Sequence, residues 1–352
     1  MIVVAMLRLP PAATRRRPAQ VAGAPSPGFD IAGKLPSSTD PVITTNITRF
    51  AHRLIRAGRA TFIVPAQSEL PRLQALQLER ISMTTDPLKS ITVPQSGGGP
   101  TLHCLLQGGE PRFLFVHGSN SSVATWVPVM SAMAALGWSS IAVDLRGHGK
   151  SSGREQLQRW RMRHYVGDVV SVLGAYPTAT TVVGHSMGGL IGQLVAAEVQ
   201  LQRLILIASS PVGGMLKDGL RMFARHPATF LAAGFKRSFA RLYRVPEVAR
   251  SLLFHPEAPD RLLAEHLANL QDESWLGGSQ LLWVLPEPAK VRCPVSVIGG
   301  THDAMVSPAS VEATARAYGV APIFVAGTAH MVPTEADPGA FAELLIRCME
   351  NG

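Results

Sequence analysis

The pattern of hydrophobic and polar residues changes near residue 80. Beyond that point, short uninterrupted runs of Val, Ile and Leu alternate with longer segments in which apolar residues recur every three or four positions. The short runs indicate strands that are covered on both faces, and the longer segments indicate amphipathic helices. The predicted strands are 79–84, 101–106, 113–117, 140–144, 181–185, 204–208, 295–299 and 323–326.

Helices are predicted between these strands. Their ranges are 123–136, 160–175, 190–199, 307–318 and 338–349. Strands that alternate with helices in this way predict an α/β fold, because each connection returns the chain to the same edge of a parallel sheet. We therefore expect a doubly wound, mostly parallel sheet of eight strands with helices on both faces.

The alternation is interrupted once, between about residues 210 and 288. This interval has helical patterning and no clear strand, and it lies between two predicted strands. It therefore begins at the carboxyl end of a strand, and open α/β sheets bind their ligands at that edge. We expect the interval to form a helical cap over the edge.

The residues before the first predicted strand have a different character. Residues 1–45 are rich in Pro, Ala and Arg without periodicity, which predicts disorder. Residues 46–78 form an N-terminal extension, in which a short basic amphipathic helix is expected at 47–60. Residues 79–352 then contain the α/β domain and its cap.

Composition excludes several classes of protein. The chain has 352 residues, of which 46% are hydrophobic, so it can bury a large core. Lys and Arg number 33 against 24 Asp and Glu, a formal net charge of +9, and part of this excess lies in the first 60 residues. The pattern of basic and aromatic residues that is typical of nucleic-acid modules is absent from the sequence, so we expect no nucleic-acid partner.

Cysteine usage and hydropathy bear on location. Cys104, Cys293 and Cys348 form no C-x-x-C pair, which argues against a zinc site and a disulfide framework and favours free thiols in a reducing compartment. The sequence contains no apolar run of the roughly 18 residues that a membrane span needs. We expect a soluble, cytoplasmic protein, although the Arg-rich start loosely resembles a transit peptide and leaves organellar targeting open.

Residues 181–189 carry the most informative motif, T-V-V-G-H-S-M-G-G. Gly184 and Gly188 flank Ser186 at a distance of two residues, a spacing that permits a very tight turn from a strand into a helix. A serine at the tip of such a turn adopts a strained backbone conformation that holds its hydroxyl clear of the sheet. This G-x-S-x-G pattern, with a strand before it and a helix at 190–199 after it, predicts that Ser186 is a nucleophile.

A serine hydroxyl needs a base to accept its proton and an acid to orient that base. His330 follows the strand 323–326 in the sequence G-T-A-H-M-V-P, and Asp303 follows the strand 295–299 in G-G-T-H-D-A-M-V. Because the carboxyl ends of parallel strands meet at one edge of a sheet, we expect both side chains to lie near Ser186.

Over about residues 80–350 the chain resembles a serine hydrolase of the α/β-hydrolase fold superfamily. The order Ser186, Asp303, His330 matches that fold, as do F-V-H-G at 115–118 and D-L-R-G-H-G-K-S at 144–151. The combination of D-x-R-G-H-G with G-H-S-M-G-G is similar to the esterase, lysophospholipase and monoacylglycerol-lipase branch. The resemblance implies hydrolysis of a carboxylic ester through an acyl-serine intermediate without a cofactor, and the sequence suggests no metal site.

The resemblance also implies an oxyanion hole. Its two donors would be the backbone N–H groups of Met187, which follows the nucleophile, and of Ser119. The chain has H-G-S-N at 117–120 where some lipases have H-G-G-G. We expect five neighbouring polar residues to brace the loops around the site by hydrogen bonds or packing; they are His117, Asp144, Arg146, His148 and His185.

The scissile bond and the partners stay open at this point. The same three residues could act on a thioester, an amide or a carbon–carbon bond, or the fold could bind a ligand without catalysis. Ser186 argues against epoxide hydrolase and haloalkane dehalogenase chemistry, because both need a carboxylate nucleophile.

A basic stretch within the expected cap bears on the substrate. Residues 217–250 hold eight basic residues against two acidic ones, with apolar residues between them. Such a stretch fits a small ester or lipid-like substrate and allows peripheral membrane contact through the cap or the N-terminus. A solvated basic face over an ordinary helical core is the alternative.

Overall fold

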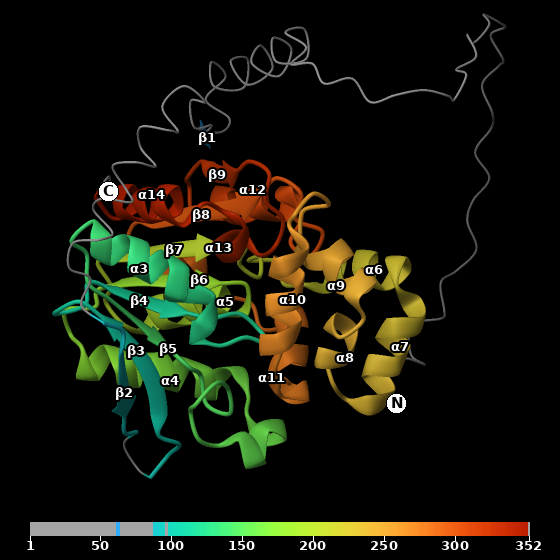
Figure 1. Ribbon diagram of the computed structural model, residues 1–352, viewed down its shortest axis with the longest axis horizontal. Coiled ribbons are helices and arrows are strands. Elements are labelled where there is room, and N and C mark those ends of the chain that lie inside the picture. The colour runs from blue at the N-terminus through green and yellow to red at the C-terminus, as the bar shows by residue number, and fades with distance from the viewer. Residues whose placement is uncertain (1–60, 64–86, 96–97, 351–352) are drawn as a thin grey trace, which may run out of the picture. The chain divides into compact units, whose positions relative to one another are not determined.

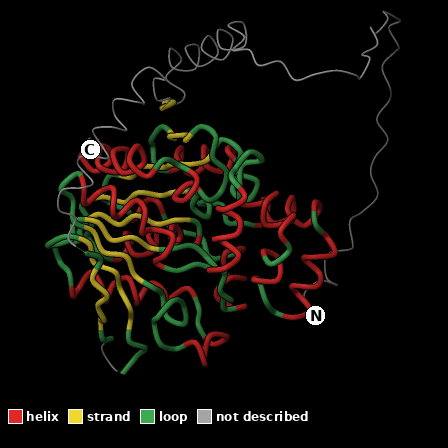
Figure 2. Tube along the Cα trace, viewed as in Figure 1, coloured by secondary structure: helices red, strands yellow, loops and turns green. Residues whose placement is uncertain are grey.

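A computed structural model describes residues 61–63, 87–95 and 98–350 of the chain (Figure 1). The predicted disordered segment 1–45, helix 47–60 and strand 79–84 lie outside these ranges. In the described part, one sheet is flanked by helices on both faces (Figure 2). No helix in this part combines the length and the apolar character required to cross a bilayer.

The described strands form a single nine-stranded sheet in the order β1-β9-β8-β7-β6-β4-β5-β3-β2. Strand β3 runs antiparallel to β2 and β5, and all the other pairs are parallel. The α/β class and the mostly parallel sheet are therefore confirmed. The strands are β1 Thr61–Ile63, β2 Lys89–Val93, β3 Leu102–Gln107, β4 Phe113–Val116, β5 Ser140–Val143, β6 Thr181–His185, β7 Arg203–Ile207, β8 Val295–Gly300 and β9 Pro322–Val325.

Two of these strands, β1 and β2, were not predicted from the sequence. Strand β2, K-S-I-T-V, lies at one edge of the sheet, and only its last residue is fully buried. Strand β1 is three residues long and lies at the other edge, beside β9. Edge strands need no continuous apolar run, so the signal that marks the central strands is missing from β2. Strand β1 is too short for its apolar residues to stand out.

Alternate residues along each central strand pack on opposite helix layers. In β7, Ile205 and Ile207 belong to the core that includes Phe341, whereas Leu204 and Leu206 belong to the core on the other face. The first layer contains η2 Val123–Trp126, α3 Val127–Ala135 and α14 Pro338–Glu350. The second contains α4 Met162–Ala175, α5 Met187–Glu198 and α12 Pro308–Ala317. The doubly wound arrangement is therefore confirmed.

Between β7 and β8 the described chain contains helices and no strand. We refer to residues 216–282 as the helical insertion; Figure 1 shows it in yellow and orange beside the sheet. Its helices are α6 Leu216–Arg225, α7 Pro227–Lys236, α8 Ala240–Tyr243, α9 Pro246–Leu253, α10 Asp260–Asn269, α11 Trp275–Ser279 and η4 Gln280–Leu282. Short helices also occur at η3 Arg154–Arg159, η5 Pro288–Lys290 and α13 Val332–Glu335.

The chain leaves the neighbouring strands β4 and β6 toward opposite faces of the sheet, and this creates the place for a site. Strand β4 lies between β5 and β6, and the chain continues from β4 to the α3 layer but from β6 to α5 in the opposite layer. The two connections therefore separate at the carboxyl ends of these strands. Such a switch point is where open α/β sheets bind ligands.

The close approach of α5 to β4 gives a test of the fold. A Cβ atom at Gly188 would lie 2.3 Å from the carbonyl oxygen of Val116, a backbone atom that has little freedom to move. We expect Gly188→Ala to lower the free energy of unfolding by about 1–3 kcal/mol, as overpacked substitutions do. At Gly167, within α4, a Cβ would meet nothing within 4 Å, and Gly167→Ala should raise stability by up to about 1 kcal/mol. Urea unfolding measures both, and equal stability of Gly188→Ala and wild type would contradict the packing.

Candidate active site

The turn that carries Ser186 is strained, as the sequence predicts. Ser186 has φ 54° and ψ −115°, a conformation that non-glycine residues rarely adopt. A Cβ at Gly184 would lie 2.3 Å from the carbonyl oxygen of Gly188, so the turn closes only with glycine there. The Ser186 side chain stands at the start of α5 and is partly exposed.

The structure brings the three predicted reactive side chains together. His330 Nδ1 lies 2.9 Å from Asp303 Oδ2, and His330 Nε2 lies 3.0 Å from Ser186 Oγ. Because a carboxylate only accepts hydrogen bonds, Nδ1 carries the ring proton and donates it to Asp303. Nε2 is then an acceptor for the Ser186 hydroxyl. The row has the geometry of a nucleophile, a base and an orienting acid.

Asp303 is fixed by its own loop. Its Oδ1 accepts hydrogen bonds from the backbone N–H groups of Met305 and Val306, both at 2.8 Å. The side chain of Asp303 has no exposed surface. These bonds leave Oδ2 directed at His330, so the carboxylate has one orientation.

The loop of His330 is held from two sides. His185 Nε2 donates to the backbone carbonyl of His330 at 2.9 Å. Burial, together with the charge on His330, lowers the pKa of His185 to about 3, so His185 remains a neutral support beneath the loop. On the other side, Glu335 accepts hydrogen bonds from the N–H of Ala329, at 2.8 Å, and of His255, at 2.6 Å.

The backbone amides of Ser119 and Met187 belong to the two segments that adjoin Ser186. A Cβ at Gly118 would lie 3.1 Å from the Cβ of Ser186, which places the loop after β4 against the serine. Ser119 follows in that loop, and Met187 is the first residue of α5. Among the described residues, neither N–H has a hydrogen-bond acceptor. The start of α5 adds the positive end of its helix dipole.

Polar residues after β4 and β5 tie the two loops together, which is the bracing expected from the sequence. His117 Nδ1 donates to the carbonyl of Gly118 at 2.8 Å, and His117 Nε2 accepts from the N–H of Leu145 at 3.1 Å. Burial, with the charge on His148, lowers the pKa of His117 to about 4, so the ring stays neutral.

Asp144 and Arg146 are also committed to structure. Asp144 accepts hydrogen bonds from His103 Nδ1 at 2.7 Å and from the backbone N–H of Val123 at 2.8 Å. Arg146 Nε and Nη2 both donate to Asp168, at 2.8 and 2.6 Å. Both side chains are therefore bonded to structural partners and make no hydrogen bond with Ser186.

A fully buried carboxylate, Glu273, joins the helical insertion to the loop of Ser119. Its Oε1 accepts from the Tyr165 hydroxyl at 2.6 Å and from the N–H of Ser274 at 2.8 Å. Its Oε2 accepts from Ser119 Oγ at 3.3 Å and lies 3.2 Å from His148 Nε2, as an ion pair without an aligned N–H. Sequence reasoning missed Glu273, because 154 residues separate it from Ser119 and no local motif surrounds it.

Glu273 and His148 stabilise each other's charges. Burial raises the pKa of Glu273, but the positive charge of His148 and the surrounding donors outweigh it and bring the pKa below its ordinary value. Burial lowers the pKa of His148, but the charge and hydrogen bonding of Glu273, the carbonyl of Arg146 and the charge of Asp144 together outweigh it and raise the pKa above its ordinary value. Both groups are therefore ionised near pH 6.

His266, on α10, is a second residue that the sequence analysis did not single out. Burial, with the charge on His330, lowers the pKa of His266 to about 4, so its ring is neutral. Its Nε2 is buried and has no hydrogen-bond partner among the described residues. His266 Nε2 therefore belongs to a neutral ring that interacts electrostatically with His330, and it is free to form a hydrogen bond with a bound molecule.

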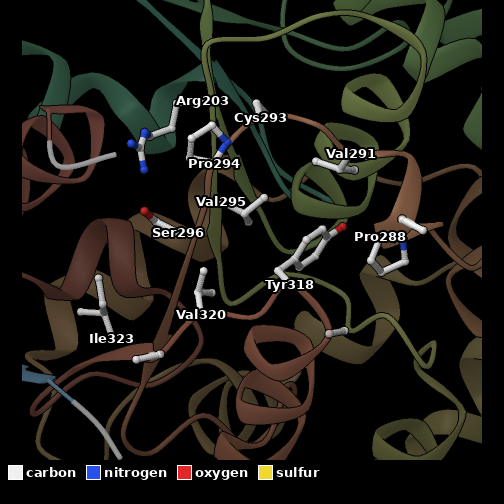
Figure 3. Close-up of a pocket in the computed structure, with 13 residues that line it drawn as sticks. Arg203, Pro288, Val291, Cys293, Pro294, Val295, Ser296, Tyr318, Val320 and Ile323 are labelled. Carbon is white, nitrogen blue, oxygen red and sulfur yellow. The ribbon is translucent and has the colours of Figure 1, made fainter. Parts of the chain in front are cut away.

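One hollow in the described part lies elsewhere. It measures about 710 Å³ and is lined by Arg203, Val295 and Ile323, which stand at the amino ends of β7, β8 and β9 (Figure 3). The reactive residues follow the carboxyl ends of β6, β8 and β9. The amino and carboxyl ends of parallel strands lie on opposite sides of the sheet, so the hollow is separate from the site.

The profile of the alpha/beta hydrolase family matches residues 113–344, which include Ser186, Asp303 and His330. The chain belongs to the alpha/beta hydrolase family. It is 37% identical over 91 residues to an epoxide hydrolase of Caballeronia sordidicola, covering 26% of this chain and 28% of that protein. It is 32% identical over 141 residues to protein phosphatase methylesterase 1 of Mus musculus, covering 38% and 36%. The chain thus spans about a third of the length of these curated relatives.

Solved structures of other alpha/beta hydrolases share the fold at low sequence identity. A membrane phospholipase A described as a bacterial virulence factor superposes with a TM-score of 0.58 at 18% identity, covering 88% of this chain and 96% of that one. A thermophilic esterase from Thermogutta terrifontis gives a TM-score of 0.56 at 20% identity, covering 76% and 99%.

The Glu273–His148 pair predicts a pH-dependent stability. A histidine with a raised pKa adds stability below its ordinary value of 6.5 and loses it as the pH rises through the folded-state pKa. A carboxylate with a lowered pKa adds stability above its ordinary value of 4.5 and loses it as the pH falls through the folded-state pKa. We expect Glu273→Gln to cost about 3 kcal/mol between these values, because the imidazolium loses its buried partner, and clearly less at pH 8.5.

Urea unfolding at pH 5.5 and pH 8.5 measures this difference. Tyr165→Phe is the matched control, because it removes an uncharged donor to the same carboxylate. Its cost, about 1–2 kcal/mol, should be similar at the two pH values. Equal losses for Glu273→Gln at both would show that the pair is not ionised.

Proposed function

We propose that this protein is a serine hydrolase that cleaves a carboxylic ester through an acyl-serine intermediate. The observation that carries the proposal is the hydrogen-bonded row from Asp303 through His330 to Ser186, with its serine on a strained turn beside two unpaired amides. A hydroxyl activated in this way attacks a planar carbonyl carbon, and the amides receive the oxygen that becomes negative.

In the first half of the reaction, His330 Nε2 removes the proton of Ser186 while Oγ forms a bond to the carbonyl carbon. Asp303 stabilises the imidazolium that results. The N–H groups of Met187 and Ser119 donate to the oxyanion. His330 then returns the proton to the leaving alcohol oxygen as the carbon–oxygen bond breaks, and the acyl group remains on Ser186.

In the second half, a water molecule takes the place of the alcohol. His330 removes one proton from the water, and the hydroxide oxygen attacks the acyl carbon. When this tetrahedral intermediate collapses, the bond to Ser186 breaks and the serine regains a proton from His330. The carboxylic acid leaves, and the three side chains return to their starting state.

The nucleophile favours an ester over an epoxide. Several curated relatives are epoxide hydrolases, but the likeness to each covers between 22% and 40% of this chain. Opening an epoxide through a covalent intermediate calls for a carboxylate nucleophile, and the residue at the tip of the turn here is Ser186. The methylesterase relative, also matched over a part of its length, supports the ester assignment.

We also assign the helical insertion as a cap over the carboxyl edge of the sheet. Hydrogen bonds connect it to the loops after β4 and β9: Asn120 Nδ2 donates to the carbonyl of Gln271 at 2.9 Å, and Met331 N–H donates to the carbonyl of Leu253 at 3.0 Å. The unpaired His266 Nε2 gives the cap a polar group for a substrate oxygen. A small ester or a lipid-like ester fits a cap with this mixture of apolar and basic residues.

The nucleophile is tested by Ser186→Ala. This change should lower hydrolysis of p-nitrophenyl esters by at least about 10³-fold and abolish covalent labelling by a fluorophosphonate, because no other hydroxyl occupies the turn. Esters of increasing acyl length, with styrene oxide as the counter-substrate, define the substrate class. Undiminished labelling of Ser186→Ala, or faster turnover of the epoxide by wild type, would contradict the proposal.

The second oxyanion donor is tested at Ser119. Because the backbone N–H is the proposed donor, Ser119→Pro should reduce kcat by about 10²–10³-fold with a smaller change in KM. Ser119→Ala keeps that N–H, loses only the Oγ contacts, and serves as the matched control with kcat within about tenfold of wild type. Urea unfolding checks that both variants fold. If Ser119→Pro and Ser119→Ala both fold and lose kcat equally, the backbone N–H of Ser119 is not an oxyanion donor.

A further inference from the structure

Helix α6 exposes an apolar stripe. Leu216, Leu220 and Phe223 occupy positions i, i+4 and i+7, and they are 47%, 57% and 40% exposed. The opposite side of α6 supplies Met222 to the core. Core packing therefore explains only one side of this helix, and the second apolar side faces solvent.

The stripe continues onto the neighbouring elements. The rings of Phe223 and Phe230 meet edge to face at 6.1 Å, which joins α6 to α7. On α7, Leu231 is 56% exposed and Phe235 is 84% exposed. Leu282, which ends η4, and Trp283, which follows it, are also exposed. Leu282 lies against α6, because a Cβ at Gly219 would be 3.6 Å from Leu282 Cδ2. Large apolar side chains exposed in this number on neighbouring elements mark a site of interaction.

The same helices and their connections expose positive charge. All the basic residues of α6–α8 and their connections are exposed; they are Lys217, Arg221, Arg225, Lys236, Arg237, Arg241 and Arg244. The single acidic residue of the same stretch, Asp218, is 1% exposed and bonded to Arg221 at 2.7 Å. The surface of this stretch therefore has no negative charge.

We propose that this surface docks the protein on an anionic lipid membrane. We call it the apolar–basic face and define it by Leu216, Leu220, Phe223, Leu231, Phe235 and the seven basic residues above. Apolar side chains that enter the acyl boundary, ringed by cations that meet lipid phosphates, are the two components of interfacial binding. A soluble polyanion would use the cations alone.

The position of the face relates it to the site. Arg221 Nη2 donates to the carbonyl of Ala304 at 3.2 Å, and Ser307 Oγ donates to Asp218 Oδ1 at 3.1 Å, so α6 is fixed to the loop of Asp303. Figure 1 shows α6 and α7 farther from the sheet than α10 and α11. The face can therefore meet a membrane while the sheet remains outside it.

Co-sedimentation of the full chain with vesicles tests the proposal. We expect binding to vesicles of equal parts phosphatidylglycerol and phosphatidylcholine, at least tenfold weaker binding to pure phosphatidylcholine, and a loss of affinity as salt is added. Ser186→Ala should bind as wild type does, because docking does not need the proposed hydrolysis. Failure of docking and failure of the proposed activity are thus separate results.

Three double variants distinguish this face from overall positive charge. Leu231→Ser with Phe235→Ser removes apolar side chains, and Lys217→Glu with Lys236→Glu reverses charge on the face. Each should weaken binding to the anionic vesicles by about tenfold or more. Lys89→Glu with Arg316→Glu makes the same change in net charge at exposed positions on β2 and α12, and it should change binding by less than about twofold.

Three results would overturn the proposal. The first is equal binding of wild type to neutral and anionic vesicles. The second is an equal loss in the control variant and the Lys217→Glu/Lys236→Glu variant, which would assign binding to net charge. The third is unchanged vesicle binding in the Leu231→Ser/Phe235→Ser variant with folding intact, which would leave only an electrostatic surface, as a soluble polyanion such as double-stranded DNA would use.

Discussion

The backbone of α5 lies against the backbone of β4 with no room for a side chain between them. At Gly188 the added carbon of an alanine would fall 2.3 Å from the carbonyl oxygen of Val116. This contact fixes where the helix begins relative to the strand, and it forces the chain through Ser186 into a positive φ. The hydroxyl then stands above the sheet edge, and His330 can reach it across the ends of the strands. A looser turn would remove the strain and also the alignment, because both come from the same close packing.

A second constraint is electrostatic. Glu273 and His148 carry opposite charges with no exposed surface on either side chain, and burying two charges costs more than an apolar pair of similar size would. The pair nevertheless fixes one arrangement: a carboxylate with donors from Tyr165, Ser274 and Ser119 has no alternative orientation. The helical insertion is held at a defined height over the loop of Ser119. The pair therefore lowers stability relative to an apolar pair, but it fixes a single arrangement of the loop of Ser119.

Short sequence motifs were sufficient to predict that Ser186, Asp303 and His330 lie together. They were not sufficient to predict the residues that hold the surrounding loops. Ser186, Asp303 and His330 each follow a continuous apolar run, so the rule that parallel strands end at one edge brings them together without coordinates. Glu273 follows no strand, and only the folding of the insertion places it beside His148. Strand β2 was missed for a different reason: at an edge, three of its five residues are exposed, and the apolar run disappears. Long-range packing, and not motif, decides these features.

The hydrogen bonds at the base of the insertion show that it is part of the framework of the site. One end of it is bonded to the loop after β4 through Gln271 and Asn120, at 2.9 and 3.2 Å. Another part is bonded to the loop after β9, where the N–H of Met331 donates to Leu253 at 3.0 Å. Under the proposed function, substrate access depends on the same bonds that position the loops of His330 and Ser119. Under that same function, a change that loosens the insertion acts on turnover as well as on selectivity, because the loops of Ser119 and His330 are both bonded to it.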